Sequence, residues 1–432
     1  MEYKEAINWL FGQLPMFSRV GAAAYKPGLE RSFSLARYFD NPHNKFKSIH
    51  IGGTNGKGSV SNLLAAILQS QGYKVGLYTS PHLVDFRERM RINGEMISEK
   101  EVIEFVEKWK QREYEGERPS FFELTMIMAF EWFANKKVDY AIIEVGMGGR
   151  LDSTNIITPI LSIITNISKD HTQFLGETLE KIAFEKAGII KNKIPVVLGE
   201  ALPETESVFE NKALETKSKL IKAYHNNNNY DKYASCCTLK GDYQINNIKT
   251  VLASVEALQE IGIYIDEKSI STGLENVEKL TGLRGRWSVM ADQPLTICDT
   301  GHNEAGLRFN ISQLERLKSE QKNCKIRFVI GFVTDKDIEN IIKLFPQDAI
   351  YYLTQAQIPR ALPYQELTDK FKEINSSIKY VKSFASVKEA YEIAKKEAAP
   401  NDIIYIGGST FIVADFLASM LFFSFYAKVK EV

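Results

Sequence analysis

Gly52-Gly53-Thr54-Asn55-Gly56-Lys57-Gly58-Ser59 follows the apolar run 47–51 and precedes a stretch, 59–71, with apolar residues at helical spacing and Gly72 at its end. The run is typical of a strand, and the stretch predicts a helix. In this order, backbone N–H groups and the positive end of the helix converge on one point, which suits a polyphosphate. Lys57 can reach outer phosphates, and the Ser59 hydroxyl can bind Mg²⁺. The alternative is an ordinary strand-to-helix turn that is rich in glycine.

Strand-like and helix-like segments alternate through most of the 432 residues, which predicts an α/β fold with a mostly parallel sheet covered by helices. The expected strands are 47–51, 74–78, 138–145, 160–165 and 194–198, followed by 295–298, 326–332, 348–353 and 403–406. The helical pattern gives way to a charged, glycine-containing stretch at 283–286. We therefore expect two domains, residues 1–285 with a P-loop-type core that binds a polyphosphate and residues 286–432 with a smaller Rossmann-like fold.

The overall charge is balanced, because 54 Lys and Arg residues face 54 Asp and Glu residues. No global field attracts nucleic acid or an anionic membrane, so the expected partners are small molecules. The four cysteines lack the spacing of a disulfide framework or zinc site, and the N-terminus lacks the pattern of a secretory signal. The apolar segment 416–426 is too short to cross a bilayer and predicts a buried terminal helix. We expect a cytoplasmic monomer.

Polar residues stand where two expected strands of the first domain end. Glu144 closes the strand 138–145 and His171 follows the strand 160–165, so both should lie near the same edge of the sheet if these strands are neighbours. Glu144 meets the preference of Mg²⁺ for oxygen ligands, although it can also be a solvated acid. From the residues alone, His171 is better explained as a capping or core histidine. Lys186, in Glu185-Lys186-Ala187-Gly188-Ile189, is typical of the last turn of a helix.

The second domain places Asp299-Thr300-Gly301-His302-Asn303 directly after its first strand. The alternative to a functional loop is a polar turn in which Asn303 caps the next helix. Arg286, just before this strand, can act as a charge clamp or as a solvated linker arginine.

The variant Gly-Thr-Asn-Gly-Lys-Gly-Ser resembles the ATP loop of the Mur ligase superfamily and, within it, of the folylpolyglutamate synthase and dihydrofolate synthase family. The resemblance extends over roughly residues 50 to 305 in the order of the family's blocks. These blocks are Thr79-Ser80-Pro81-His82-Leu83 with Glu88-Arg89, the run 144–152, Asp170-His171, Glu185 to Ile189, and Asp299 to Asn303.

The resemblance implies a role for each candidate residue. It implies that Ser59, Glu144 and His171 serve two Mg²⁺ ions, and that Lys186 is carbamylated so that it can bind the second ion. Lys57, Lys186, Asp299 and His302 become the catalytic candidates. The nucleotide-binding candidates are Gly53, Thr54, Asn55, Gly56, Lys57, Gly58, Ser59, Asn247, Arg286 and Asp299.

The reaction that the resemblance implies is ATP-dependent activation of a carboxylate as an acyl phosphate, which the amino group of L-glutamate attacks. The second domain would then be the glutamate ligase domain. We expect a bifunctional enzyme that acts on dihydropteroate and on folates. The alternatives are a ligase restricted to folate γ-glutamylation, a ligase for another substrate such as a cell-wall precursor, and a non-catalytic nucleotide switch. Thr300, Gly301 and Glu304 depart from the family's common form, as does Tyr243, where the family often has histidine.

Overall fold

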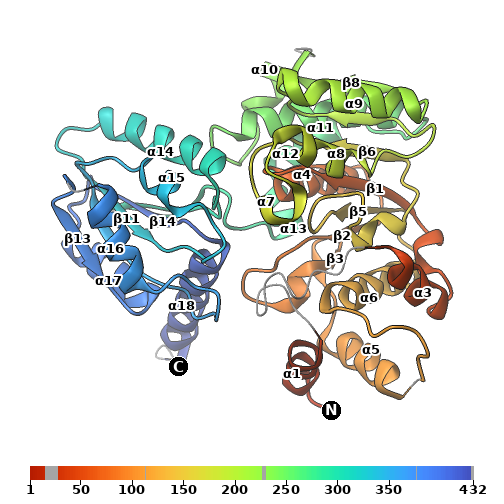
Figure 1. The fold of residues 1–432 in the computed structure, drawn as a ribbon, viewed down its shortest axis with the longest axis horizontal. Helices are drawn as coiled ribbons and strands as arrows, with labels where there is room; N and C mark the ends of the chain where they lie inside the picture. The colour runs from red at the N-terminus through yellow and green to blue at the C-terminus, as the bar shows by residue number, and fades with distance from the viewer. Residues whose placement is uncertain (15–27, 112, 226–229, 376, 430–432) are drawn as a thin grey trace. The chain divides into compact units, whose positions relative to one another are not determined.

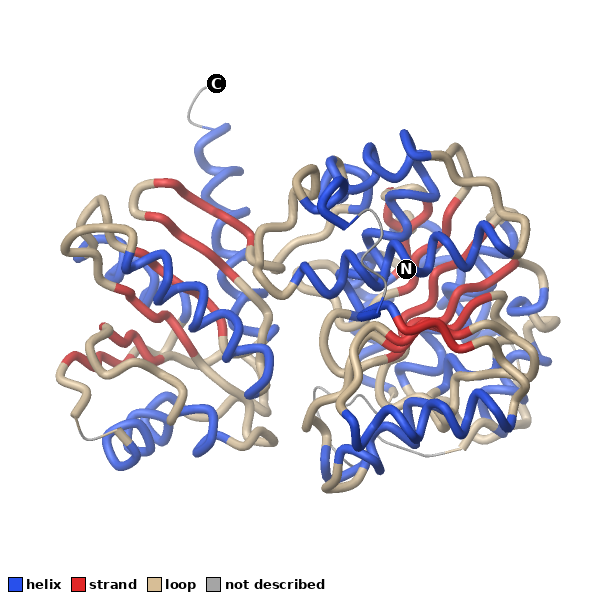
Figure 2. Tube along the Cα trace, turned by 90° about the horizontal axis from the view of Figure 1, so that it is seen from above, coloured by secondary structure: helices blue, strands red, loops and turns tan. Residues whose placement is uncertain are grey.

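The computed structural model describes residues 1–14, 28–111, 113–225, 230–375 and 377–429, and the side chains of the last helix to residue 420 (Figure 1). The chain divides into two compact units. The first contains residues 1–238 and 243–283, and the second contains residues 239–242 and 284–432. In Figure 2 the strands of each unit lie together, with helices on both sides of them. The predicted α/β class is confirmed.

The first unit is built on an eight-stranded sheet in the order β4-β3-β2-β5-β1-β6-β7-β8. Strands β2, β5, β1, β6, β7 and β8 are parallel; β3 pairs antiparallel with β2, and β4 pairs antiparallel with β3. The bounds are β1 Lys47–Gly52, β2 Val75–Tyr78, β3 Met90–Ile92, β4 Glu95–Met96, β5 Tyr140–Glu144, β6 Leu161–Ile164, β7 Val196–Leu198 and β8 Leu220–Lys222.

Helices of the first unit bury both faces of this sheet. One face packs against α6 beside β5, and against α8 and α9 beside β6 and β7. Helix α4 is buried along its length and meets α12 so closely that a Cβ at Gly273 would lie 2.6 Å from the Ile67 backbone. The bounds are α1 Tyr3–Gln13, α3 Glu30–Tyr38, α4 Lys57–Ser70, α5 Glu99–Gln111, α6 Phe121–Asn135, α7 Thr172–Leu175, α8 Leu179–Ala187, α9 Pro203–Glu215, α10 Tyr230–Ala234, α11 Gln244–Glu260, α12 Glu267–Glu275 and α13 Val277–Thr281, with short 3₁₀ turns at Pro42–Asn44, Phe86–Arg89, Ser153–Ile156 and Ala223–His225.

The second unit has a six-stranded sheet in the order β13-β12-β11-β14-β10-β9, parallel except for β9. Its core joins the sheet to α14, α15 and α16. The bounds are β9 Ser288–Asp292, β10 Leu295–Cys298, β11 Ile326–Ile330, β12 Ile350–Leu353, β13 Tyr380–Ser383, β14 Ile403–Gly407, α14 Glu304–Ser319, α15 Ile338–Ile342, α16 Tyr364–Ile374, α17 Val387–Glu397 and α18 Thr410–Val429.

All nine expected strands are present, most of them one to three residues shorter than predicted. The strands that the sequence did not predict lie outside the central parallel strands: β3, β4, β8, β9 and β13. They are short, and several of their side chains are exposed, so they lack the continuous apolar run of a central strand. The predicted terminal helix lies within α18, where Phe416 and Leu417 are buried. Within the described residues, no helix combines the length and apolar character that crossing a membrane requires.

Candidate functional site

The phosphate loop connects the centre of the first sheet to the buried helix α4. Gly56 has φ +84° and stands before Lys57, where the helix begins, two residues earlier than predicted. Gly53 has φ +138°, and a Cβ there would lie 1.9 Å from the Thr165 hydroxyl oxygen. Both positions therefore require glycine. The loop thereby presents the N–H groups that begin α4 at the carboxyl end of β1, as an anion site needs.

Two lysines meet at this loop. Lys57 Nζ donates to the carbonyl oxygens of Gly53 (3.1 Å) and Thr54 (3.0 Å), and Lys186 Nζ donates to the same Gly53 oxygen (2.8 Å). Lys186 is 4% exposed and lies in the last turn of α8, as predicted. Burial, and then the charge of Lys57, lowers the pKa of Lys186 from its ordinary 10.5 to about 7. Near neutral pH, a large fraction of Lys186 is therefore an uncharged amine.

Hydrogen bonds through Gln244, a residue that the sequence analysis did not identify, connect Ser59 and Asn247. The Ser59 hydroxyl accepts a hydrogen bond from Gln244 Nε2 (3.2 Å), and Gln244 Oε1 accepts one from Asn247 Nδ2 (2.8 Å). All three are buried. Gln244 lies one helical turn before Asn247 at the start of α11, which is the signal that could have identified it. The structure therefore brings the predicted metal-side hydroxyl and the predicted nucleotide-binding asparagine together.

Glu144 and His171 lie at the same edge of the sheet, although their strands are not neighbours. Strands β5 and β6 flank β1, which leads into the phosphate loop; Glu144 is the last residue of β5, and His171 follows β6. The buried Glu144 accepts a hydrogen bond from the Ser80 N–H (3.3 Å). His171 has φ +51° and stands at the N-cap of α7, but its side chain makes no capping hydrogen bond, so the capping explanation does not hold. Its Nε2 lies 4.0 Å from Asp170 Oδ2.

Asp152 shapes the glycine loop that follows Glu144. Its carboxylate accepts hydrogen bonds from the N–H groups of Met147 (2.8 Å) and Thr154 (3.0 Å), and burial raises its pKa. The loop then lies on the end of α8, where a Cβ at Gly149 would come 2.9 Å from the Lys186 carbonyl oxygen. The segment that carries Glu144 therefore packs directly against the helix turn that carries Lys186.

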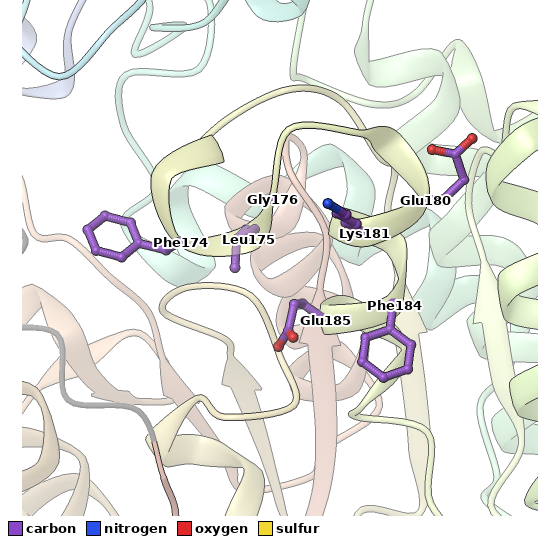
Figure 3. A pocket seen from close by; sticks show the side chains of 7 residues that line it. All are labelled: Phe174, Leu175, Gly176, Glu180, Lys181, Phe184 and Glu185. Atoms are coloured by element: carbon purple, nitrogen blue, oxygen red, sulfur yellow. The ribbon is translucent and has the colours of Figure 1, made fainter.

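An open groove is lined by the end of α7, the turn that follows it, and α8 (Figure 3). Its lining includes Phe184, which is 58% exposed and lies under the Arg150 guanidinium at 5.6 Å from the ring centroid. None of the predicted site residues lines this groove, which is formed by Phe174, Leu175, Gly176, Glu180, Lys181, Phe184 and Glu185. It is therefore distinct from the phosphate loop.

The donors present fit a metal that arrives with a nucleotide. Within the described residues, no group of three or more His, Cys, Asp or Glu residues is placed to hold an ion. Ser59 and Glu144 each offer one oxygen donor group near the phosphate loop. Mg²⁺ takes one or two protein ligands and completes its shell with phosphates and water, so this sparse donor set suits it.

In the second unit, Asp299 holds the loop after β10. The carboxylate is 3% exposed and accepts hydrogen bonds at 2.7 Å from the N–H groups of Trp287 and Gly301 and from Asn310 Nδ2. Because so many donors converge on it, Asp299 organises this loop. Asn303 caps α14 by accepting a hydrogen bond from the Gly306 N–H (2.9 Å), as the alternative predicted.

Arg286 and His302 contact the same residue of this loop, Thr300. The Arg286 guanidinium donates to the Thr300 hydroxyl and to the Gly285 carbonyl (3.2 Å). His302 Nδ1 donates to the Thr300 carbonyl (3.0 Å), because a carbonyl oxygen can only accept. Arg286, Asp299 and His302 therefore form one constellation within the second unit.

Comparisons with known proteins follow the two-part organisation of the chain. The Mur ligase middle domain matches residues 51–255, and the Mur ligase glutamate ligase domain matches residues 285–410. The dihydrofolate synthase/folylpolyglutamate synthase of Bacillus subtilis is 30% identical over 96% of this chain and 98% of its own length. The protein of the same name from Haemophilus influenzae is 33% identical over 91% and 94%, respectively.

Solved structures agree over nearly the whole length. Escherichia coli FolC in complex with DHPP and ADP is 28% identical, with a TM-score of 0.80 over 97% of this chain and 98% of that one. The bifunctional folylpolyglutamate synthase/dihydrofolate synthase of Yersinia pestis, complexed with AMPPNP and a Mn ion, is 26% identical, with the same TM-score and coverage.

Proposed function

Because this chain belongs to the dihydrofolate synthase/folylpolyglutamate synthase family of Mur ligases, we propose that it adds L-glutamate to dihydropteroate and to folates at the expense of ATP. The resemblance predicted from the sequence is thereby confirmed, and the chain is an ATP-dependent ligase. The observation that carries the proposal is the meeting of Lys57 and Lys186 at the Gly53 carbonyl, beside the strand that ends in Glu144.

The reaction has two steps. A carboxylate oxygen of the acceptor attacks the γ-phosphorus of ATP, the bond to the β-phosphate breaks, and ADP leaves an acyl phosphate behind. The amino group of L-glutamate then attacks the acyl carbon, phosphate departs, and loss of a proton leaves an amide. Phosphorylation is needed because a carboxylate has no adequate leaving group. Lys57 and the first N–H groups of α4 offset the negative charge that gathers when two anions meet.

A divalent metal, when bound, neutralises phosphate charge and polarises the phosphoryl oxygens. Ser59 and Glu144 are the groups proposed to hold a first Mg²⁺ ion, and His171 with a modified Lys186 a second. The Mn ion in the Yersinia pestis relative supports a divalent metal, and the number of ions is part of the proposal. Anomalous density with Mn²⁺ and an ATP analogue tests it, because a single ion bound without His171 contradicts the second site.

The modification proposed for Lys186 is a carbamate. A buried amine with a pKa of about 7 has a lone pair available to attack CO₂, forming an N–C bond and releasing one proton. The product is an anion that a cation can bind. Labelling with ¹³C-bicarbonate tests this, because a carbamate gives a new carbonyl NMR signal that Lys186→Met removes. An active enzyme without that signal contradicts the modification.

Phosphate release measured with dihydropteroate and with tetrahydrofolate, each with and without L-glutamate, separates the possible activities. Turnover of both acceptors establishes the bifunctional ligase, and turnover of tetrahydrofolate alone establishes the restricted one. Failure with both contradicts the substrate assignment. Nucleotide-dependent partner binding without amide product would favour a switch protein. The proposed monomer is checked by light scattering, where a dimer mass contradicts it.

A further inference from the structure

Asn166 closes the phosphate loop from the side of β6. Its backbone carbonyl accepts a hydrogen bond from the Thr54 N–H (2.9 Å), and its side-chain Oδ1 accepts one from the Asn55 N–H (2.9 Å). The side chains of Thr54 and Asn55 are also engaged there, with the backbone and hydroxyl of Ser168, respectively. Thr54 and Asn55 therefore hold the loop against residues 166–168.

Glu200 fixes the Asn166 amide from the other side. Asn166 Nδ2 donates to Glu200 Oε1 (3.4 Å), and Glu200 Oε2 accepts a second hydrogen bond from Asn246 Nδ2 (2.8 Å). The Glu200 backbone N–H donates a hydrogen bond to the carbonyl oxygen of Thr165 (2.9 Å), which directly follows β6. Burial raises the pKa of Glu200. A half-buried acid with two amide donors therefore lies between the phosphate loop and the first turn of α11.

The first turn of α11 also carries Asn247, which lies against the phosphate loop. A Cβ at Gly56 would come 2.3 Å from Asn247 Oδ1, so the two segments touch directly. The Asn166–Glu200–Asn246 chain thus connects two segments that already meet at Gly56. The hydrogen bonds of this chain and the close packing at Gly56 together fix the loop in position and in orientation relative to α11.

We infer that Asn166 and Glu200 are positioning residues of the nucleotide site, which hold the phosphate loop in register with the helix that carries Asn247. The inference rests on the proposed function only in that this loop binds ATP. Neither residue needs to touch the nucleotide, because each acts through the groups that it orients. The ordinary explanation is that the network only braces the fold, which predicts a loss of stability without a selective loss of nucleotide affinity.

The test measures ADP affinity with Mg²⁺ by calorimetry, together with the KM values for ATP and for the pterin acceptor. Asn166→Asp keeps the oxygen that faces the Asn55 N–H, but it replaces the amide donor with a carboxylate opposite Glu200. We expect about tenfold weaker ADP binding and a similar rise in KM for ATP, about 1.4 kcal/mol, with the acceptor KM within twofold. Glu260→Gln, at the exposed end of α11, is the control and should leave the ADP affinity and the KM for ATP unchanged.

A second pair of variants uses the polarity of the network. Asn166 and Asn246 both donate hydrogen bonds to Glu200. In Glu200→Gln, the new side-chain NH₂ group faces one of these two donors, and we expect this to weaken ADP binding. Adding Asn246→Asp supplies an acceptor for the new amide and recovers at least half of the loss, which a general loosening of the fold would not do.

ADP affinity within twofold of wild type in folded Asn166→Asp and Glu200→Gln, or no recovery in the double variant, overturns the inference. If Asn166→Asp does not fold, as judged by circular dichroism, the Glu200→Gln and Asn246→Asp cycle decides alone. A wild type that binds ADP but makes no amide product contradicts the proposed function instead, and the affinity measurements still decide the role of Asn166 and Glu200.

Discussion

Lys57 and Lys186 donate to one acceptor, the backbone carbonyl oxygen of Gly53, at 3.1 and 2.8 Å. Two amines drawn to a single oxygen repel each other when both are protonated, which is why the charge of Lys57 contributes to the lowered pKa of Lys186. Lys57 of the phosphate loop therefore influences the protonation of Lys186, the residue proposed to be carbamylated, before any ligand is bound.

The lowered pKa of Lys186 predicts a pH-dependent stability. Between about pH 7 and pH 10.5, the unfolded chain holds a proton on this amine that the folded chain has lost. The free energy of unfolding should therefore rise with pH across this window. Lys186→Met, measured by urea unfolding in CO₂-free buffer, should show a shallower rise than wild type. Identical slopes would show that the folded-state amine titrates normally.

Lys57→Met is expected to reduce kcat by about a hundredfold or more, because a positive charge that neutralises the transferring phosphoryl group is lost. It should also raise the pKa of Lys186, since the charge of Lys57 helps to lower it. Phosphate release gives the first result, and the pH dependence of carbamate formation, followed by ¹³C NMR, gives the second. An unchanged midpoint for the carbamate would argue against the coupling.

Gly56→Ala is expected to impair nucleotide binding through a steric contact. The residue has φ +84°, and the added Cβ would lie 2.3 Å from Asn247 Oδ1, so both the loop and Asn247 must move. Gly72→Ala is the matched control, because its φ is +95° but no atom lies within 4 Å of the new Cβ. The control should cost about 1–2 kcal/mol of stability and leave the KM for ATP unchanged. If both variants changed the KM for ATP equally, the contact with Asn247 would not explain the effect of Gly56→Ala.

Asp299→Asn should destabilise the protein apart from any effect on catalysis. The carboxylate accepts hydrogen bonds from Trp287, Gly301 and Asn310, and an amide in its place turns one acceptor into a donor that faces another donor. Each buried donor left without a partner costs about 1–3 kcal/mol. Asp292→Asn, at an exposed position of β9, is the control. Wild-type stability together with lost activity would instead indicate that Asp299 acts directly on ligands.

The sequence predicted most completely what is encoded locally. The phosphate loop, the central strands and the position of Glu144 follow from apolar runs and glycines that are adjacent in the chain. The partners of these residues come from distant segments and could not be predicted: Lys186 Nζ reaches Gly53 from a helix 133 positions away, and Gln244 reaches Ser59 from 185. The conformation of His171 could not be predicted either. Its left-handed backbone, and the hydrogen bond from its N–H to the Asp170 carboxylate, depend on the path that the chain takes after β6.

A buried ion pair in the second unit gives a prediction that is independent of the nucleotide site. Arg327 Nε donates to Asp402 Oδ2 (2.8 Å), while Asp402 also accepts hydrogen bonds from the backbone N–H groups of Lys325 and Ala399 at 3.0 Å. Both side chains of the pair are at most 7% exposed. Removing one partner of such a pair leaves an uncompensated buried charge, which costs about 3–5 kcal/mol. Arg327→Met should therefore be strongly destabilising.

Asp402→Asn should destabilise the protein less than Arg327→Met. It should still lose one of the hydrogen bonds from the backbone N–H groups, because an amide offers a single acceptor oxygen. The double variant should be less destabilised than the sum of the two single variants, since the second substitution removes a charge that the first has left unpaired. Denaturant unfolding of all four proteins gives the coupling free energy. ADP affinity should be unchanged throughout, because neither Arg327 nor Asp402 is among the residues proposed to bind the nucleotide. Additive losses would mean that solvent screens the pair, in contradiction to its burial.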